Sequence, residues 1–119
     1  MSEDLDNKGL KSIVENYDIF YIDLWGVIHN GISLHENAIV ALEEITKVNK
    51  EYVLLTNAPR PKKSVQLFLE EMGMNEEIRE KVYSSGEAAL SYLKKNFSNN
   101  KFFHIGPPRD FDLFLDFKK

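Results

Sequence analysis

The sequence alternates short apolar runs with longer stretches in which apolar residues recur every three or four positions, and few folds accommodate that alternation. Four short runs rich in β-branched and aromatic residues are expected to form strands, at residues 17–24, 52–55, 82–84 and 101–105. Three stretches of helical periodicity separate them, at residues 35–49, 61–73 and 87–97. Strands that alternate with helices predict βαβ units and a mainly parallel sheet, so the expected fold is a three-layer α/β/α sandwich of Rossmann type.

Length and composition indicate one small globular domain. The chain has 119 residues, of which 43% are hydrophobic, and this supplies enough apolar material for one core, so residues 1–119 are expected to form a single domain. The net charge of -4 and the lack of a basic stripe exclude nucleic acid as a partner. Because cysteine is absent, disulfides and thiolate metal sites are excluded. No apolar run is long enough for a signal peptide or a membrane span, so we expect a cytoplasmic protein with no membrane partner.

Two polar residues stand where predicted strands end, and ligands bind at the carboxyl ends of strands in open α/β sheets. Asp23 ends the first run, which is expected to be buried, and Thr56 follows the second. The Asp23 carboxylate could act as a nucleophile or metal ligand, or could simply cap a turn. Thr56 and Asn57 could donate hydroxyl and amide groups to an anion, or could form a turn before Pro59. Each signal is unspecific alone.

Taken together, these residues resemble the haloacid dehalogenase-like (HAD) hydrolase superfamily. The resemblance rests on the strand-end motif Asp23-Leu24-Trp25-Gly26-Val27 and on the second strand end, Leu54-Leu55-Thr56-Asn57. The segments DLWGVIHNG and LLTNAPRP are most similar to the class IIA sugar-phosphatase-like branch, in which a cap domain is inserted later in the chain. The similarity spans about residues 17–109 and implies a HAD-like core without the cap.

The resemblance implies phosphoryl transfer and a role for each motif residue. Asp23 would attack phosphorus and form an aspartyl-phosphate, which water would then hydrolyse. Mg²⁺ would be held by the Asp23 carboxylate, by the backbone carbonyl of Trp25 and by a later acidic motif. Thr56 would hydrogen-bond the phosphoryl group, with Asn57 beside it. Arg60 stands close enough in sequence to meet a substrate anion, although a surface arginine between prolines is an equally good interpretation.

The chain departs from the superfamily pattern at two places. Phosphatases of the superfamily usually carry a second aspartate where this chain has Trp25, and an indole can neither protonate the leaving group nor activate water. The lysine motif and the acidic metal motif also have no candidate before Lys118 and Lys119. We therefore expect an incomplete core domain that is inactive alone.

Three functions remain open. The first is a phosphatase that acts on a small phosphorylated metabolite such as a sugar phosphate, and the second is a non-catalytic binding module with the same fold. The third is a dehalogenase-like displacement at carbon, because dehalogenases of the superfamily also lack the second aspartate. The threonine motif and the loop after Asp23 favour the phosphatase.

The histidines and the apolar C-terminal tail complete the candidates. His29 could replace the missing acid or base, but we favour a surface or hinge position for a loop histidine. His35 is expected on a helix surface, and His104 is expected half-buried with its hydrogen bonds satisfied. The tail from Phe111 to Phe117 would need burial, and so predicts self-association.

Overall fold

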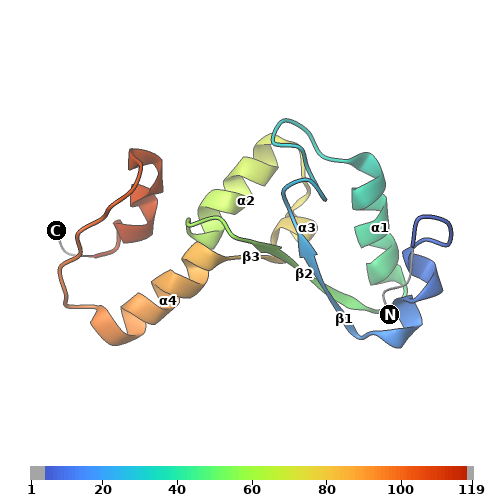
Figure 1. Ribbon diagram of the computed structural model, residues 1–119, viewed down its shortest axis with the longest axis horizontal. Helices are drawn as coiled ribbons and strands as arrows, with labels where there is room; N and C mark the ends of the chain where they lie inside the picture. Colours follow the sequence, from blue (N-terminus) through green and yellow to red (C-terminus); the bar gives the residue numbers. More distant parts are fainter. Residues whose placement is uncertain (1–4, 118–119) are drawn as a thin grey trace. The chain divides into compact units, whose positions relative to one another are not determined.

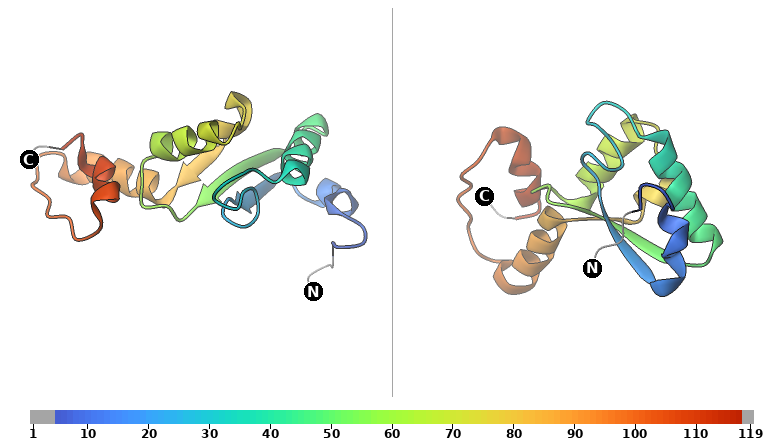
Figure 2. Two further views of the ribbon diagram at one scale, coloured as in Figure 1. Left: turned by 90° about the horizontal axis from the view of Figure 1, so that it is seen from above. Right: turned by 45° about the vertical axis from the view of Figure 1, so that its right-hand side comes forward.

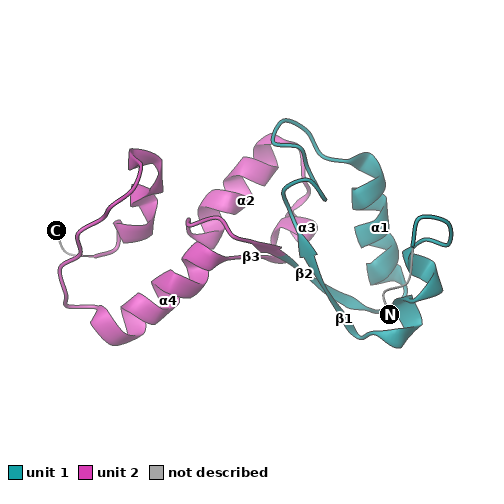
Figure 3. Ribbon diagram, in the orientation of Figure 1, with its two compact units in different colours: residues 1–54 teal, residues 55–119 magenta. Residues whose placement is uncertain are grey.

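The computed structural model describes residues 5–117, so the terminal residues 1–4 and 118–119 of the predicted domain lie outside the described part. The chain divides into two compact units, residues 1–54 and 55–119 (Figure 3). β2 runs across this division, because its last two residues belong to the second unit. No helix in the described part is both long and apolar enough to cross a membrane.

Three parallel strands form the sheet, and they are labelled in Figure 1. They are β1 (Ile19–Asp23), β2 (Glu51–Thr56) and β3 (Val82–Ser84), in the order β1-β2-β3. This confirms the α/β fold class with a parallel sheet. The prediction of a buried first strand was wrong, because β1 is an edge strand and its Tyr21 side chain is 68% exposed.

The first unit places one amphipathic helix after a long loop. Two short 3-10 turns, η1 (Leu10–Ser12) and η2 (Val14–Asn16), precede β1, and α1 (Glu36–Lys47) follows the loop. Leu42 and Ile45 are the buried residues of α1 and lie three positions apart, as expected for a helix with one apolar face. Helical periodicity therefore located this element within a few residues of its observed ends.

The second unit contains three helices and a C-terminal 3-10 helix. They are α2 (Lys62–Glu71), α3 (Glu76–Arg79), α4 (Ser85–Phe97) and η3 (Pro108–Phe114). α2 and α4 both contact β3, and their buried side chains Leu69 and Leu90 lie with Val82 in the core. η3 lies beside α4, as the two views of Figure 2 show.

The prediction of a final strand at residues 101–105 was wrong. These residues belong to no strand, although their side chains alternate as strand residues do. The Phe102 and His104 rings pack on aromatic rings of the C-terminal segment, whereas Phe103 and Ile105 are each 91% exposed. A strand also needs a hydrogen-bonded neighbour, and ring packing organises this segment instead.

Candidate functional site

The loop after β1 presents Asp23 to solvent on a tightly folded backbone. Its carboxylate is exposed, and Oδ1 accepts a hydrogen bond of 2.8 Å from the backbone N–H of Leu24. The Leu24 carbonyl in turn accepts from the amides of Val27, Ile28 and His29 at 2.8 to 3.2 Å. Leu24 and Ile28 are both buried. Asp23 is therefore an accessible carboxylate at the end of a strand, and backbone hydrogen bonds to Leu24 fix the turn that follows it.

The Trp25 side chain packs against later residues of the same loop. The indole is 64% exposed and lies against the His29 ring, with 5.5 Å between the ring centroids. At Gly31, which has a φ of 90°, an added Cβ would lie 2.6 Å from the indole Cη2. The tryptophan therefore packs within the loop, which leaves the chain with no acidic side chain at this position.

His29 is buried in this loop, so the predicted surface or hinge position was wrong. Only 3% of its surface is exposed, and Nδ1 accepts a hydrogen bond of 3.0 Å from the Gly31 N–H. Burial lowers the pKa of His29, the charge of His35 lowers it further, and Asp23 raises it. The neutral imidazole is therefore favoured, with its proton on Nε2. His35 is exposed, as predicted.

Thr56 is the last residue of β2, and its hydroxyl oxygen accepts from the Ala58 N–H in the following loop at 3.2 Å. Because a hydroxyl also carries one proton, Thr56 keeps a donor for another group. Asn57 is exposed beside it, and Thr56 itself is partly exposed. These two residues therefore offer hydroxyl and amide donors at the end of β2, in the second unit.

The Arg60 side chain is engaged by an acidic residue 52 positions later. Asp112 on η3 accepts from Arg60 Nε at 3.0 Å and Nη2 at 2.9 Å, all on its Oδ2 atom. Ser64 Oγ donates to the same oxygen at 2.6 Å. Asp112 therefore occupies one edge of the guanidinium, and the Nη1 donors of this 39% exposed side chain are not used by that pair.

The five predicted site residues thus fall at two strand ends and on the loops that follow them. Asp23 and Trp25 lie at the end of β1 and in its loop in the first unit, and Thr56, Asn57 and Arg60 lie at the end of β2 and in its loop in the second unit. Among residues 5–117, no group of three or more histidine, aspartate or glutamate side chains could hold a metal ion. The oxygen donors of Asp23 and Trp25 nevertheless suit Mg²⁺, which keeps several waters and often takes one or two carboxylates plus a substrate phosphate.

The structure adds two residues that the sequence interpretation missed. Ser84 is the N-cap of α4, and its Oγ accepts from the Glu87 N–H at 3.0 Å. The spacing of Ser84 and Glu87 is that of a capping box, so the true helix start could have been found in the sequence. The partnership of Asp112 with Arg60 has no local signal, because it joins distant segments.

His104 was predicted half-buried and satisfied, and only the first part is correct. The side chain is half-buried among the rings of Phe111 and Phe114. Its Nδ1 atom is buried without a hydrogen-bond partner in the described part of the chain. The ring therefore serves packing.

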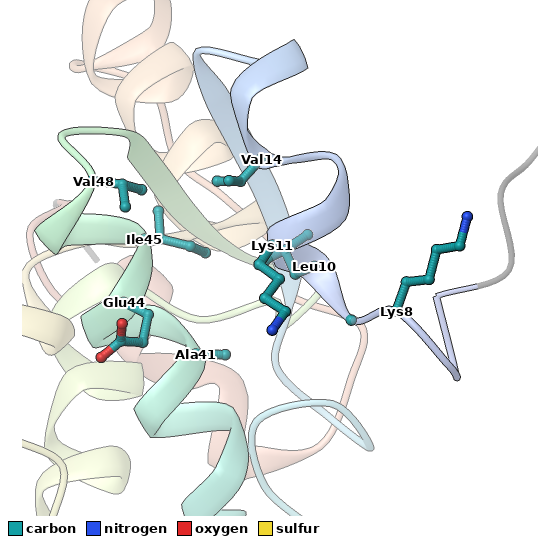
Figure 4. Close-up of a pocket in the computed structure, with 9 residues that line it drawn as sticks. Lys8, Leu10, Lys11, Val14, Ala41, Glu44, Ile45 and Val48 are labelled. Carbon is teal, nitrogen blue, oxygen red and sulfur yellow. The ribbon is translucent and has the colours of Figure 1, made fainter.

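A separate cavity of about 310 Å³ lies in the first unit, between the 3-10 turns and α1 (Figure 4). Its lining is mostly apolar and also includes three charged residues: Lys8, Gly9, Leu10, Lys11, Val14, Ala41, Glu44, Ile45 and Val48. None of the predicted site residues lines it. The cavity is therefore not part of the strand-end site.

In this α/β fold an exposed aspartate ends one parallel strand and a partly exposed threonine ends the next. The sequence profile of the haloacid dehalogenase-like hydrolase family matches residues 20–117. The chain therefore belongs to this family, which confirms the resemblance seen in the sequence. The comparison with curated proteins found no match.

Solved structures agree with this assignment. A haloacid dehalogenase-like hydrolase from Brucella suis 1330 is 29% identical, with a TM-score of 0.78, over 92% of this chain and 41% of that one. A glycerol phosphate phosphatase from Mycobacterium tuberculosis, in complex with magnesium, is 26% identical, with a TM-score of 0.54, over 73% of this chain and 26% of that one. A 4-nitrophenylphosphatase from Thermotoga maritima, 24% identical, shares the fold with a TM-score of 0.67 over 86% of this chain and 39% of that one. The chain thus spans less than half the length of these relatives.

Proposed function

We propose that this chain is part of a phosphatase-type HAD hydrolase that acts on a small phosphorylated metabolite, such as a sugar phosphate, in the cytoplasm. The observation that carries the proposal is the exposed Asp23 carboxylate at the end of β1, in a chain that belongs to a hydrolase family. The phosphatases among its structural relatives support the choice of a phosphate substrate.

In the proposed reaction, a carboxylate oxygen of Asp23 attacks phosphorus while the bond from phosphorus to the leaving oxygen breaks. The leaving oxygen takes the electron pair and needs a proton, and the aspartyl-phosphate then needs a water molecule. The Asp23 carboxylate and the Trp25 carbonyl would hold Mg²⁺, which would reduce the repulsion between carboxylate and phosphate. Thr56 would donate its hydroxyl proton to a phosphoryl oxygen, and Asn57 would add an amide donor.

Arg60 takes a secondary place in this proposal. Its guanidinium already binds Asp112 through Nε and Nη2, so its positive charge is partly neutralised and fewer donors remain for a substrate. We therefore assign phosphate contact first to Thr56 and Asn57.

The loop of the first unit lacks an acid or base for the leaving group. Trp25 has no titratable side chain, and His29 is buried with Nδ1 engaged and a lowered pKa, which disfavours its protonated form. A positioned acid or base typically contributes about 10²–10⁴-fold in rate, so a phosphatase built on this loop should be slow. The same observation favours the second candidate, a HAD-fold module that binds phosphorylated metabolites without turnover.

Phosphate binding tests the proposal on the chain itself. Inorganic phosphate is titrated into ¹⁵N-labelled protein with Mg²⁺ present, and amide shifts are followed by NMR. We expect weak binding that moves the amides of Leu24, Trp25 and Asn57, and that is weakened in Asp23→Asn and Thr56→Val. Amide shifts confined to other residues would contradict the proposal. So would a phosphate affinity in both variants equal to that of the parent.

Turnover separates the remaining alternatives. With few metal donors in its described part, the chain should show no Asp23-dependent hydrolysis of 4-nitrophenyl phosphate. Such hydrolysis, if detected, would show that the chain is an enzyme by itself. Asp23-dependent release of halide from a 2-haloacid would instead support carbon-centred chemistry.

A further inference from the structure

The first turn of α4 binds the backbone of the loop that follows Thr56. Gly86 donates its N–H to the Ala58 carbonyl at 3.0 Å, and Ser84 Oγ donates to the Arg60 carbonyl at 2.6 Å. Glu87 Oε2 accepts from the Lys62 N–H at 2.8 Å. Three neighbouring residues thus hold two carbonyls of this loop and the first N–H of α2.

Ser84 contributes a hydroxyl whose hydrogen-bonding capacity is used on both sides. Only 1% of its surface is exposed. The oxygen accepts from the Glu87 N–H, while its single proton goes to the Arg60 carbonyl. Replacement by alanine would leave a part-buried carbonyl and a helix N–H without this partner, and unsatisfied groups of this kind are costly.

Gly86 allows the helix and the loop to approach closely. An added Cβ would lie 2.3 Å from both the nitrogen and the oxygen of the Arg60 backbone. Backbone atoms cannot rotate away as the end of a flexible side chain can, so either the loop or the helix would have to shift. Glycine is a poor helix residue, and the close approach explains its presence here.

These contacts connect directly to the Thr56 hydroxyl. The Ala58 carbonyl accepts from Gly86, and the Ala58 N–H donates to Thr56 Oγ1. Ser85 Oγ makes a longer contact of 3.3 Å to the Thr56 carbonyl. A shift of the Ala58 backbone would therefore change the direction in which Thr56 can donate its proton.

We propose that Ser84 and Gly86 are positioning residues that fix the loop from Thr56 to Arg60 in the conformation that binds a phosphoryl group. The inference rests on the proposed function, because it assumes that this loop meets phosphate. Donors that stabilise an oxyanion act best when they are held in place beforehand, and α4 supplies that support. Neither residue touches the substrate itself.

The test measures phosphate affinity and stability in the same variants. Mg²⁺ and inorganic phosphate are titrated into ¹⁵N-labelled Ser84→Ala and Gly86→Ala, and each variant is also unfolded in urea. Both should bind phosphate about 10- to 100-fold more weakly than the parent, the scale expected when binding groups are misplaced by up to 1 Å. If Gly86→Ala fails to fold, Ser84→Ala decides the outcome.

Two controls separate positioning from general loss of stability. Gly73→Ala puts a side chain at a φ of 89° where no atom lies within 4 Å, so it should lower stability without changing phosphate affinity. Ser91→Ala removes an exposed hydroxyl from α4 and should change neither quantity. A loss of affinity in Gly73→Ala as large as in Ser84→Ala would overturn the inference.

The outcomes distinguish this inference from the function on which it rests. If Thr56→Val loses affinity but Ser84→Ala and Gly86→Ala bind as the parent does, the positioning role is wrong and the proposed function stands. If Thr56→Val binds as the parent does while Asp23→Asn loses affinity, the positioning role is wrong, because the loop from Thr56 does not meet phosphate. If the parent binds no phosphate, or if both Asp23→Asn and Thr56→Val bind as the parent does, both are wrong.

Discussion

At the scale of single residues, Trp25 shows how one side chain can shape a loop and restrict its chemistry. The indole lies against His29 and over Gly31, so the loop after Asp23 is closed by packing. A short acidic side chain at this position could not make these contacts. The residue that organises the loop is therefore the same residue that removes the acid and base expected in a phosphatase.

The close approach of Trp25 to Gly31 predicts a large effect of Gly31→Ala. A left-handed backbone costs a non-glycine residue about 1–2 kcal/mol, and displacement of the indole should add to this. We expect a total loss of about 2–4 kcal/mol in the free energy of unfolding, measured in urea by circular dichroism. Fluorescence of Trp25, the single tryptophan, should change as well.

Gly73→Ala is the matched control for that substitution. Its φ of 89° is close to the 90° of Gly31, but no atom lies within 4 Å of the added Cβ. The control therefore reports the backbone penalty alone. Equal losses in the two variants would show that the indole moves aside freely and that its packing contributes little.

His29 predicts a dependence of stability on pH. Burial and the charge of His35 hold its folded-state pKa below the ordinary value of 6.5, against the opposing effect of Asp23. Its contribution to stability is complete above about pH 6.5 and declines as pH falls from there to the folded-state pKa, because the unfolded chain binds the proton first. The urea midpoint of the parent should therefore fall between pH 7.5 and pH 5.5.

Two glutamine variants test whether His29 causes the fall of the urea midpoint with pH. His29→Gln should flatten the fall in midpoint, whereas His35→Gln, which changes an exposed side chain, should retain most of it. Unchanged slopes in His29→Gln would show that other groups govern the acid response.

At the scale of elements, the C-terminal segment, which comprises η3 and the residues after it, is held to the rest of its unit by two acidic residues, Asp112 within η3 and Asp116 beyond its end. Asp112 is half-buried and receives three donors on one oxygen. Asp116 pairs with Lys94 at 2.6 Å, but both side chains are largely exposed. Exposed ion pairs contribute little, so Asp112 should account for most of the attachment.

Paired alanine substitutions test this difference. Asp112→Ala should cost about 1–3 kcal/mol, because Arg60 and Ser64 lose a shared acceptor, and should speed amide hydrogen exchange in residues 108–114. Asp116→Ala should cost less than about 1 kcal/mol and leave exchange almost unchanged. Equal effects would mean that ring packing, and not Asp112, holds this segment.

The elements also show which parts of the fold can be predicted from sequence. The alternation of periods correctly located α1, β2 and β3, because it reflects local burial. It missed α3, which is a single turn and too short for a period, although its N-cap Asn75 carries a usable signal. The strand predicted at residues 101–105 failed for a different reason, because strand formation depends on a neighbour that local sequence does not specify.

In the candidate site, too, some features could be predicted from the sequence and others could not. Asp23 and Thr56 could be found because both end apolar runs, and strand ends are visible in sequence. The burial of His29 could not, since it depends on the loop closing under Trp25. The pairing of Arg60 with Asp112 joins positions 52 residues apart, and no local sequence pattern predicts it.

At the scale of the whole molecule, the distribution of exposed apolar side chains changes the basis for expecting self-association. The tail from Phe111 was expected to drive self-association. Phe117 is buried and the rings of Phe102, Phe114 and Phe117 pack on one another, whereas Leu115 and Phe111 are 75% and 52% exposed. Phe103 and Ile105, which precede the tail, are more exposed still. Self-association through the tail therefore remains a prediction, and we add Phe103 and Ile105, the most exposed of these side chains, as its main contributors.

The double variant Phe103→Lys/Ile105→Glu tests this prediction. Both side chains are 91% exposed, so their replacement removes apolar surface without disturbing a core, and the two new charges balance. We expect the parent to form concentration-dependent oligomers in sedimentation velocity, and the double variant to remain monomeric at the same concentrations. Ile32→Glu is the control, because Ile32 is 87% exposed but lies in the first unit. If Ile32→Glu abolishes association and the double variant does not, the first unit carries the contact; a parent that stays monomeric throughout would refute self-association altogether.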